Sequence, residues 1–371
     1  MVKYIYENEN WTDFYWDDAA IGQVFGEVRH LQGKILGQMA LMGFDTKSQS
    51  QLNNLIQDVV KTSEIEGERL DYEQVRSSIA RKLGMNEGGL SPSNRHVEGI
   101  VEILLDATQR FQEPLSHQRL FGWHAALFPT GYSGMYKIEV GAFRTGEMEV
   151  VFGALGKQKV HYQAVPAEKV QAEMERFITW FNESSKLDPV IKAAIAHFWF
   201  IIVHPFDDGN GRIARALADM LLARADQTAE RHYSFSTQIM IEQKQYYSVL
   251  QRVQHSDGDI TDWLMWFLTC LKNSLLAAET TLERVVAKAS FWNRHAETLL
   301  NVRQQLLLNK LLDGFEGKLQ TSKWAKIAKC SHDTALRDIK DLLDKGILKQ
   351  EEGGGRSTNY ELVGTTLPTK E

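Results

Sequence analysis

The fold of this chain is constrained most strongly by a long apolar run, PVIKAAIAHFWFIIV, that leads into a polar segment with two glycines. The run covers residues 189–203 and is long and apolar enough for a buried helix, with His204 at its carboxyl end. After the segment HPFDDGNG, apolar residues recur at helical spacing, so a second helix is expected to begin near Arg212. The sequence therefore predicts two helices joined by a tight glycine turn.

The predicted turn has the chemistry of an anion site. Gly209 and Gly211 permit dihedrals closed to other residues, so successive backbone N–H groups can converge on an anion at the positive end of the second helix. Asp208 could hold a divalent cation, and Arg212 and Arg215 are neighbours on one helix face. A glycine turn is often only a connection, but four phosphate-directed features in one turn favour a polyphosphate site.

In this stretch the chain resembles the Fic family, whose signature is H-x-F-x-[DE]-G-N-G-R-x-x-R. Its fixed positions are filled by His204, Phe206, Asp208, Gly209, Asn210, Gly211, Arg212 and Arg215. The resemblance implies transfer of AMP from ATP to a hydroxyl group of a target protein, with release of pyrophosphate. Such transfers need mainly positioning, charge neutralisation and a base near the nucleophile, which agrees with these residue types.

The resemblance also implies roles for single residues. His204 would be the general base, Asp208 would hold Mg²⁺ between the phosphates, and Phe206 would anchor the loop in the core. Asn210 and the glycine N–H groups would surround the phosphates, and Arg212 would pair with them. Within the loop and the second helix, the implied ATP site comprises Asp208, Gly209, Asn210, Gly211, Arg212, Ile213, Ala214 and Arg215.

A second motif lies upstream, where Thr62, Glu66 and Gly67 fit the family's inhibitory pattern [ST]-x-x-x-E-[GN]. Alone, this segment is typical of a solvated acidic helix end, and Gly67 is a natural helix stop. The resemblance implies that Glu66 pairs with Arg215 and occupies the place of the γ-phosphate, which makes Glu66 both inhibitory and part of the ATP site. Glu64 lies about 200° round the helix from Glu66, so both cannot face the same arginine.

Residues 149–153 and 158–162 are β-prone runs separated by residues 154–157, which predicts a hairpin. On a helical domain such a hairpin is often decoration. In the Fic family a hairpin flap covers the active site and presents the target protein by strand addition. The preceding residues 141–144, GAFR, resemble the family's lead into this flap. The flap residues nearest the nucleotide would be Val150, Val151, Phe152 and Gly153.

Two adjacent tyrosines, Tyr246 and Tyr247, lie in a helix predicted within residues 236–254. Paired tyrosines in a helix most often serve packing. The matching region of the Fic family closes over the adenine, so the resemblance makes both tyrosines candidates for base contacts. Gln254 is a weaker candidate in the same helix.

The last part of the chain is expected to form a separate domain that resembles a winged helix-turn-helix. A helix is expected at residues 302–312, followed by a helix-turn-helix pair at residues 321–328 and 331–339. A strand should follow at residues 346–349, then a glycine-rich turn at residues 353–356 and a second strand at residues 358–363.

DNA binding by this domain would place residues 333–343 in the major groove, with Lys349 or Arg356 on phosphates. The same helix contains four aspartates that would repel phosphate, Asp333, Asp338, Asp341 and Asp344. A packing or protein-interaction role is therefore favoured over DNA binding.

The chain has 371 residues, so we expect more than one domain within a mainly α fold. An N-terminal helical region with the inhibitory motif should cover residues 1–95, an all-helical Fic core with the hairpin flap residues 96–285, and the winged-helix-like domain residues 286–371. Asp45 is expected to cap the second of the helices that the pattern predicts at residues 17–42, 46–65, 97–111 and 115–128.

Composition favours a soluble cytoplasmic protein. The formal charge of −6 argues against general attraction to nucleic acid or membrane, and no apolar run reaches transmembrane length. Two cysteines, Cys270 and Cys330, cannot form a disulfide framework and indicate a reducing compartment. The aromatic and acidic amino end is unlike a signal or transit peptide. The sequence leaves a homodimer open.

Two classes of function compete. The first is an autoinhibited protein adenylyltransferase that uses ATP and Mg²⁺ to modify a Ser, Thr or Tyr hydroxyl of a target and of itself. The second is a DNA-binding regulator whose Fic core senses a nucleotide. Fic relatives also transfer other phosphate-containing groups or remove AMP. A metal phosphohydrolase built on His204, Asp207 and Asp208 is weaker, because a convincing second His–Asp set is lacking.

Overall fold

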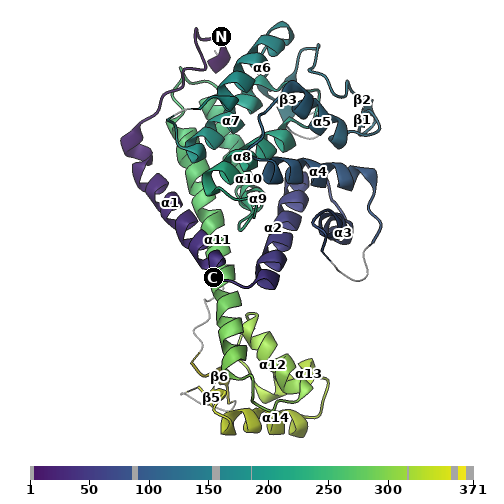
Figure 1. Ribbon diagram of the computed structural model, residues 1–371, viewed down its shortest axis with the longest axis vertical. Helices are drawn as coiled ribbons and strands as arrows, with labels where there is room; N and C mark the ends of the chain where they lie inside the picture. The colour runs from purple at the N-terminus through teal and green to yellow at the C-terminus, as the bar shows by residue number, and fades with distance from the viewer. Residues whose placement is uncertain are drawn as a thin grey trace. The chain divides into compact units, whose positions relative to one another are not determined.

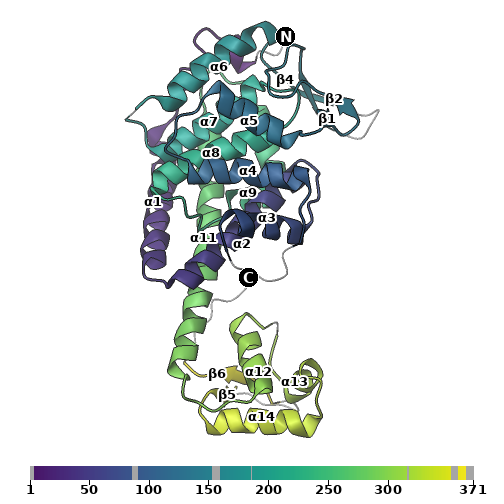
Figure 2. The same ribbon diagram turned by 45° about the vertical axis from the view of Figure 1, so that its right-hand side comes forward.

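The computed structural model is almost entirely helical, and its described strands form two-stranded hairpins (Figures 1 and 2). The chain folds into two compact units, residues 1–276 and 277–371. The prediction of a mainly α fold is therefore confirmed. The structure describes residues 4–85, 91–152, 159–184, 186–315, 317–351 and 358–364.

The first unit consists of helices around the apolar run and the glycine turn. In chain order its elements are η1 (Ile5–Glu7), α1 (Asp18–Ala40), α2 (Phe44–Ile65), α3 (Tyr72–Lys82), α4 (Arg95–Gln109), α5 (His117–Leu127), β1 (Tyr132–Ser133), β2 (Tyr136–Lys137), β3 (Glu149–Phe152), β4 (Lys159–Gln163), α6 (Ala167–Asn182), α7 (Pro189–Val203), α8 (Asn210–Asp226), α9 (Phe235–Ile241) and α10 (Gln243–Val253). Helix α11 (Thr261–Arg294) begins in this unit and continues into the second.

Helix α7 is the predicted apolar run and lies in the interior, packed against α8 and α6 (Figures 1 and 2). Asp188 caps its amino end by accepting the Val190 N–H at 2.8 Å, and Pro189 supplies a first-turn residue that needs no partner for an N–H. The following helix begins at Asn210, slightly earlier than predicted, because Gly209 adopts a left-handed conformation with φ of 82° and reverses the chain.

Helix α2 carries the predicted inhibitory segment and packs against α3, α8 and α9. The prediction that Asp45 caps it is wrong, because the helix already begins at Phe44 with Gly43 as its N-cap. Its carboxyl end agrees with the prediction, since the last helical residue is Ile65 and Gly67 follows with φ of 82°. This left-handed residue turns the chain out of the helix axis.

The hairpin predicted after the helices at residues 97–111 and 115–128 is formed by β3 and β4, which are antiparallel with Val150 opposite Tyr162. The register shifts between Val150 and Val151. Gly153 and the predicted turn at residues 154–157 lie outside the described residues. A shorter hairpin, β1 and β2, was not predicted, because strands of two residues are too short to show alternation.

The second unit follows the predicted order of helices and strands after α11, with α12 (Val302–Leu312), α13 (Thr321–Ile327), α14 (His332–Asp344), β5 (Leu348–Gln350) and β6 (Tyr360–Leu362). The turn predicted at residues 353–356, with Arg356, lies outside the described residues. Trp324, Ile339 and Leu342 are fully buried in its own hydrophobic core. Strand β6 pairs with β5, and Tyr360 also bridges to Leu319. Among the described residues of the whole chain, no helix is both long and apolar enough to cross a membrane.

Candidate functional site

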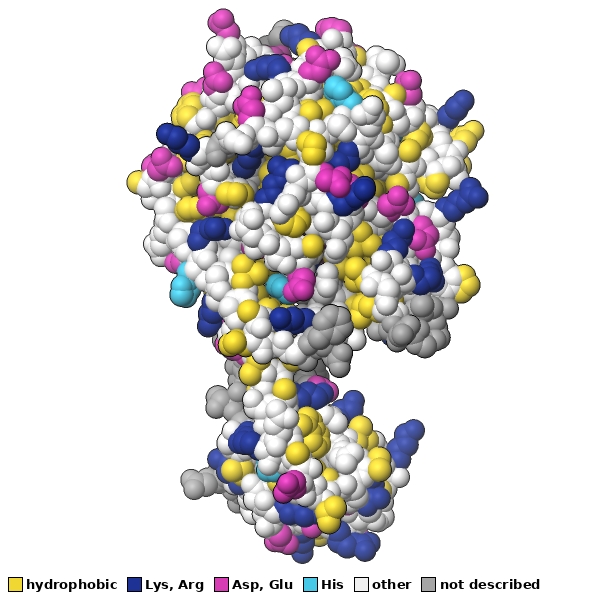
Figure 3. Space-filling model, viewed as in Figure 1, with side chains coloured by type: hydrophobic (Ala, Val, Ile, Leu, Met, Phe, Trp, Pro, Cys, Tyr) yellow, Lys and Arg dark blue, Asp and Glu magenta, His cyan; other side chains and the backbone are white. Residues whose placement is uncertain are grey.

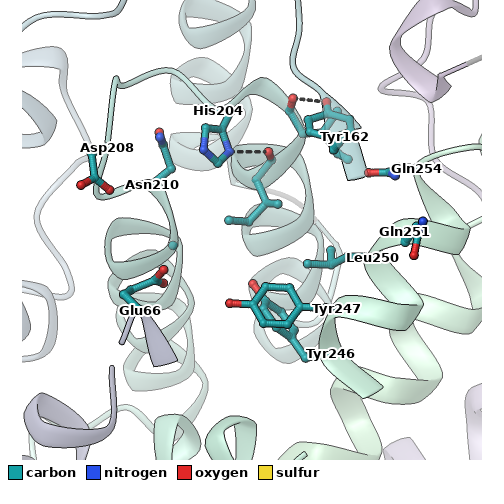
Figure 4. Close-up of a pocket in the computed structure, with 13 residues that line it drawn as sticks. Glu66, Tyr162, His204, Asp208, Asn210, Tyr246, Tyr247, Leu250, Gln251 and Gln254 are labelled. Carbon is teal, nitrogen blue, oxygen red and sulfur yellow. Dashed lines mark hydrogen bonds between the residues drawn. The ribbon is translucent and has the colours of Figure 1, made fainter. Parts of the chain in front are cut away.

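A pocket of about 190 Å³ lies beside the turn between α7 and α8 (Figure 4). The turn and the end of α2 contribute one end of it, which we call the loop end, and β4 and α10 contribute the other, which we call the aromatic end. The loop end is lined by Glu66, His204, Asp208, Asn210 and Gly211, and the aromatic end by Tyr162, Tyr246, Tyr247, Leu250, Gln251 and Gln254, with Ile201 and Ile202 also contributing.

His204 caps the carboxyl end of α7 in a left-handed conformation, with φ of 48°. Its Nδ1 lies 3.3 Å from the carbonyl oxygen of Ile201, and a carbonyl only accepts hydrogen bonds. Nδ1 therefore carries the hydrogen of the neutral ring, and Nε2 carries a lone pair. Burial lowers the pKa of His204 to about 4, so the ring is neutral at pH 7. This histidine can accept a proton.

Arg144 fixes the backbone that carries His204. Its buried guanidinium donates from Nε to the His204 carbonyl at 2.7 Å and from Nη2 to the Val203 carbonyl at 3.2 Å, while its backbone N–H donates to Pro205 at 2.9 Å. These bonds satisfy carbonyl groups that the end of α7 leaves without helical partners. In the sequence Arg144 was only part of a lead into the hairpin, so this positioning role was missed.

Phe206 and Asn210 hold the loop between the two helices. Phe206 is fully buried, and its ring stacks on His124 with centroids 4.2 Å apart. The Asn210 amide accepts the Phe206 N–H at 2.9 Å and donates to the Phe206 carbonyl at 2.7 Å. In this structure the amide therefore shapes the loop, although Asn210 also lines the pocket.

Both glycines of the loop are required by close approach. A Cβ on Gly209 would lie 2.9 Å from a Leu127 methyl group, in addition to the strain of its positive φ. A Cβ on Gly211 would lie 2.2 Å from Oε1 of Glu66. The Glu66 carboxylate thus rests directly on the first turn of α8, where the helix dipole favours an anion.

The same carboxylate binds Arg215, which is 1% exposed. Arg215 donates from Nη2 to Glu66 Oε1 at 2.7 Å and from Nε to the Thr62 hydroxyl at 2.6 Å. The rival carboxylate, Glu64, accepts instead from Lys61 at 2.7 Å. The structure therefore brings Thr62 and Glu66 together with Arg215, which is distant from both in sequence, and Glu66 is the carboxylate that faces the arginine.

Arg212 has a partner that the sequence reasoning missed. Its Nη1 donates to Oε2 of Glu68 at 2.9 Å, and its guanidinium lies 5.2 Å from the centre of the Phe128 ring. His96 Nε2 lies 3.1 Å from the same Glu68 oxygen. The available signal was the spacing E-G-E at residues 66–68, which puts a second carboxylate just beyond the helix stop.

Asp208 is the residue best placed for a cation. Its side chain is 42% exposed, accepts a hydrogen bond from the Ser133 hydroxyl, and lies 3.8 Å from Arg212. Asp207 accepts the Glu139 N–H at 3.0 Å. The described part of the chain contains no cluster of three His, Cys, Asp or Glu side chains that could hold a metal. Any Mg²⁺ at Asp208 would thus need further oxygen ligands from phosphate or water.

The aromatic end of the pocket is built by packing. Tyr246 is buried, its hydroxyl lies 3.0 Å from His197 Nε2, and its ring centre is 5.0 Å from that of Tyr247. Leu250 and Gln251 follow the tyrosines by four residues each, so they lie on the same face of α10. The sequence reasoning missed this pair, although helical spacing could have indicated it.

Residues from the start of the chain pack behind this end. The Ile5 N–H donates to the Gln254 carbonyl at 2.7 Å. The rings of Tyr4 and Tyr6 meet the edge of Tyr162, with centroids 5.5 and 6.3 Å away. The Tyr162 hydroxyl donates to the Ile202 carbonyl. The N-terminal segment therefore supports two residues that line the pocket.

Among the described residues that were predicted for the site, Arg212, Ile213, Ala214 and Arg215 do not line the pocket. Ile213 and Ala214 are fully buried in α8, and Arg212 and Arg215 face the side of α8 that meets α2. Strand β3 provides the backbone of residues 150–152, whose side chains are outside the described part, as is Gly153.

Comparison with known proteins matches two parts of the chain to known families. Residues 114–222 match the Fic/DOC family, and residues 4–85 match DUF4172, a domain of unknown function. Protein adenylyltransferase fic-1 of Caenorhabditis elegans is 37% identical over 90 residues, 24% of this chain and 16% of that protein. Protein adenylyltransferase Fic of Drosophila grimshawi is 36% identical over 106 residues, 28% of this chain and 20% of that protein. The chain thus matches a fifth or less of these relatives.

Solved structures show the same fold. A Fic family protein from Desulfovibrio desulfuricans G20 matches with a TM-score of 0.55 at 21% identity and covers 95% of this chain and 98% of its own. A Fic domain-containing signaling protein from Bacteroides thetaiotaomicron matches with a TM-score of 0.51 at 20% identity, over 71% of this chain and 97% of its own. These similarities show that the chain has the Fic fold. The chain carries a Fic domain, and the resemblance to the Fic family is confirmed.

Proposed function

We propose that the chain is an autoinhibited protein adenylyltransferase, which transfers AMP from ATP to a Ser, Thr or Tyr hydroxyl of a target protein and of itself. The observation that carries the proposal is the Glu66 carboxylate on the first turn of α8, bound to Arg215. A built-in anion at this position indicates that the loop binds anions. The names of the curated relatives, protein adenylyltransferases, supply the reaction class.

In the proposed reaction, the hydroxyl oxygen of the target forms a bond to the α-phosphorus of ATP. The bond from that phosphorus to the oxygen of the β-phosphate breaks, and pyrophosphate leaves. The hydroxyl proton passes to Nε2 of His204, whose Nδ1–H is held by the Ile201 carbonyl. Mg²⁺ held by Asp208, together with the arginines and the N-terminus of α8, would neutralise the phosphate charge.

Inhibition follows from competition for one cation. Arg215 is buried and uses both Nε and Nη2 on the α2 segment, so a γ-phosphate could reach it only if Glu66 moved away. With both anions present, carboxylate and phosphate would repel each other strongly in this buried site. Glu66 is therefore proposed as the inhibitory residue, and ATP that binds beside it would hold its α-phosphate in an unreactive position.

The β3–β4 hairpin is proposed to present the target. It is a two-stranded sheet within the described residues, so each strand pairs with only one neighbour there. An extended segment of the target could add along such an edge through main-chain hydrogen bonds, leaving its hydroxyl side chain available for reaction. Substitution of the hairpin should then reduce modification of a target more than binding of ATP.

Mass spectrometry tests the proposal directly. The protein and its Glu66→Gly variant are incubated with Mg²⁺ and ATP, and the intact mass is measured. A mass gain of one AMP, larger in the variant and lost in Glu66→Gly/His204→Ala, is expected. No gain in any of these proteins would overturn the proposed reaction.

A second candidate function is DNA binding by the second unit, because the structure weakens the charge argument against it. Asp338 accepts from Arg303 at 2.8 and 3.0 Å and from Asn301 at 2.9 Å, and Asp341 accepts from Gln304 at 2.7 Å. Two of the four aspartates of α14 therefore face α12, where Arg303 neutralises Asp338, while Asp341 pairs with Lys345 just after α14. The exposed cations on α13, α14 and the turn between them include Lys326, Lys329, Arg337 and Lys340.

Figure 3 shows Lys and Arg side chains along the part of the second unit that carries α13 and α14. A nucleotide-sensing DNA-binding regulator would use this face. A salt-dependent shift of a promoter fragment at physiological ionic strength, weakened in Arg337→Glu/Lys340→Glu, would support this function. Equal migration of the fragment with and without protein would exclude it.

A further inference from the structure

The turn after α2 carries two carboxylates rather than one. Glu66 and Glu68 flank Gly67, whose left-handed conformation turns the chain, so the two glutamate side chains point in different directions. Glu66 binds Arg215 at 2.7 Å, and Glu68 binds Arg212 at 2.9 Å. Residues 66–68, which we call the α2 turn, therefore contact both arginines of the Fic loop.

Glu68 binds Arg212 outside the nucleotide pocket, because Glu68 is not among the described residues that line it. Of the described residues, those that line the pocket include Glu66 and Gly211 but neither arginine. Both arginines instead line a separate cavity of about 20 Å³ between α2 and α8, together with Thr62. Arg212 is 5% exposed, its Nη1 is taken by Glu68, and its Nη2 lies 3.8 Å from Oδ1 of Asp208, which lines the pocket.

Glu68 is itself held in place by His96 of α4. His96 Nδ1 lies 3.3 Å from the Leu127 carbonyl, and Nε2 lies 3.1 Å from Glu68 Oε2. Because both neighbours are acceptors, only the protonated ring can donate to both. Burial alone would raise the pKa of Glu68, but the His96 hydrogen bond and the Arg212 charge outweigh it, and the pKa is lowered. Glu68 thus stays ionised between two cations.

We propose that Glu68 is a second inhibitory residue, which holds Arg212 away from the phosphates of ATP while Glu66 holds Arg215. Both carboxylates belong to one short turn, so a movement of the α2 turn releases both arginines together. The inference rests on the proposed function in one respect, that Arg212 is a phosphate ligand. If Glu66 alone is lost, Arg215 is released but Glu68 still holds Arg212.

The test measures binding of a non-hydrolysable ATP analogue by calorimetry to full-length protein. Glu68→Gln is expected to raise the affinity about tenfold, as expected for the loss of one charge-assisted competitor. Glu66→Gly/Glu68→Gln should bind more tightly than Glu66→Gly by a similar factor. The matched control is Glu64→Gln, which removes a carboxylate of the same segment that pairs with Lys61 and should leave the affinity unchanged.

A second measurement checks the contact itself. Titration of His96 by NMR should show a lower pKa in Glu68→Gln than in the unmodified protein, because Glu68 raises it. An unchanged His96 titration, or an affinity in Glu68→Gln equal to that of Glu64→Gln or below the unmodified protein, would overturn the second inhibitory contact. So would the absence of analogue binding in every variant.

The two proposals fail in different ways. Tighter analogue binding by Glu68→Gln without any transfer of AMP would leave the second contact standing and remove the transferase. Transfer of AMP by Glu66→Gly with no further effect of Glu68→Gln on affinity or labelling would leave the transferase standing and remove the second inhibitory contact.

Discussion

The two ends of the pocket are built on different principles. At the loop end, charged groups satisfy one another: Arg215 binds Glu66, and behind it Arg212 binds Glu68. At the aromatic end, Tyr246 and its neighbours are fixed by packing and by neutral hydrogen bonds. Under the proposed function, the loop end must therefore exchange these internal anions for the phosphates of ATP before transfer can occur. The aromatic end is already formed, so inhibition should weaken binding of the phosphates of ATP more than binding of its adenine.

This difference also separates how each end should respond to change. Ion pairs in a partly buried site depend strongly on single charges and on protonation, and removing one partner leaves the other uncompensated. Aromatic packing spreads its contribution over many contacts, each of modest size. Substitutions at the loop end should therefore have large effects on transfer, and those at the aromatic end small effects on affinity.

The largest effect is expected at His204, the proposed general base. In the Glu66→Gly background, His204→Ala should lower the rate of AMP transfer by about 10²- to 10⁴-fold, the usual contribution of a general base. The affinity for ATP should stay within about twofold, because His204 bears no charge on the phosphates. Radiolabelling and calorimetry measure the two quantities. Full labelling by this variant would remove His204 from the reaction.

The next largest effect is expected at Glu66. Glu66→Gly should raise self-labelling at least about tenfold, because the Arg215 guanidinium becomes available to the γ-phosphate. Glu64→Gly is the matched control, since it places the same residue two positions earlier without touching Arg215. Equal labelling of the two variants would contradict the assignment of inhibition to the loop end.

Much of the loop end could be predicted from the sequence, because its signals are local. The apolar run at residues 189–203 sets a buried helix, and the left-handed glycine at position 209 ends the turn. Helix geometry separates Glu64 from Glu66 before any coordinates are known. Side-chain direction along one helix is fixed by spacing, so these predictions needed no tertiary contact.

The rest depends on contacts between segments that are distant in the chain. Nothing in the spacing of Glu68, His96 and Arg212 indicates that they meet, because the approach of α2, α4 and α8 is set by packing. The Arg144 bonds to the end of α7 were missed for the same reason. The aspartates of α14 show a further gap, since a count of charges does not tell which of them face α12.

A pH effect of intermediate size is expected on the affinity for ATP, and it should arise at the loop end and not at the aromatic end. The pKa of His96 is raised by its hydrogen bond to Glu68, against burial and the charge of Arg212, with the Leu127 carbonyl also facing it. A raised pKa means that the contact is fully present below the ordinary histidine value of about 6.5 and is lost as pH rises through the pKa of the folded protein. Affinity for ATP should therefore increase as pH rises above about 6.5 and through the raised pKa of His96.

The control for this effect is adenosine, which lacks phosphates and should reach only the aromatic end. Its affinity should not change over the same range, because the pKa of Tyr247 is raised by burial to about 12. The Glu68→Gln variant should lose most of the pH dependence for ATP. A pH dependence that is equal for ATP and adenosine would break the distinction between the ends.

The smallest effect is expected where the N-terminal segment supports the aromatic end. Tyr4→Ala should weaken the edge contact with Tyr162, whose ring centre lies 5.5 Å away. An aromatic pair contributes about 0.5–1.5 kcal/mol, so the KM for ATP should rise by about two- to tenfold. The maximal rate should stay unchanged, because no group at the loop end is altered. Tyr72→Ala, at an exposed tyrosine of α3, is the control for general destabilisation. A fall in the maximal rate instead of a rise in KM would mean that packing behind the aromatic end also sets the geometry of the loop end.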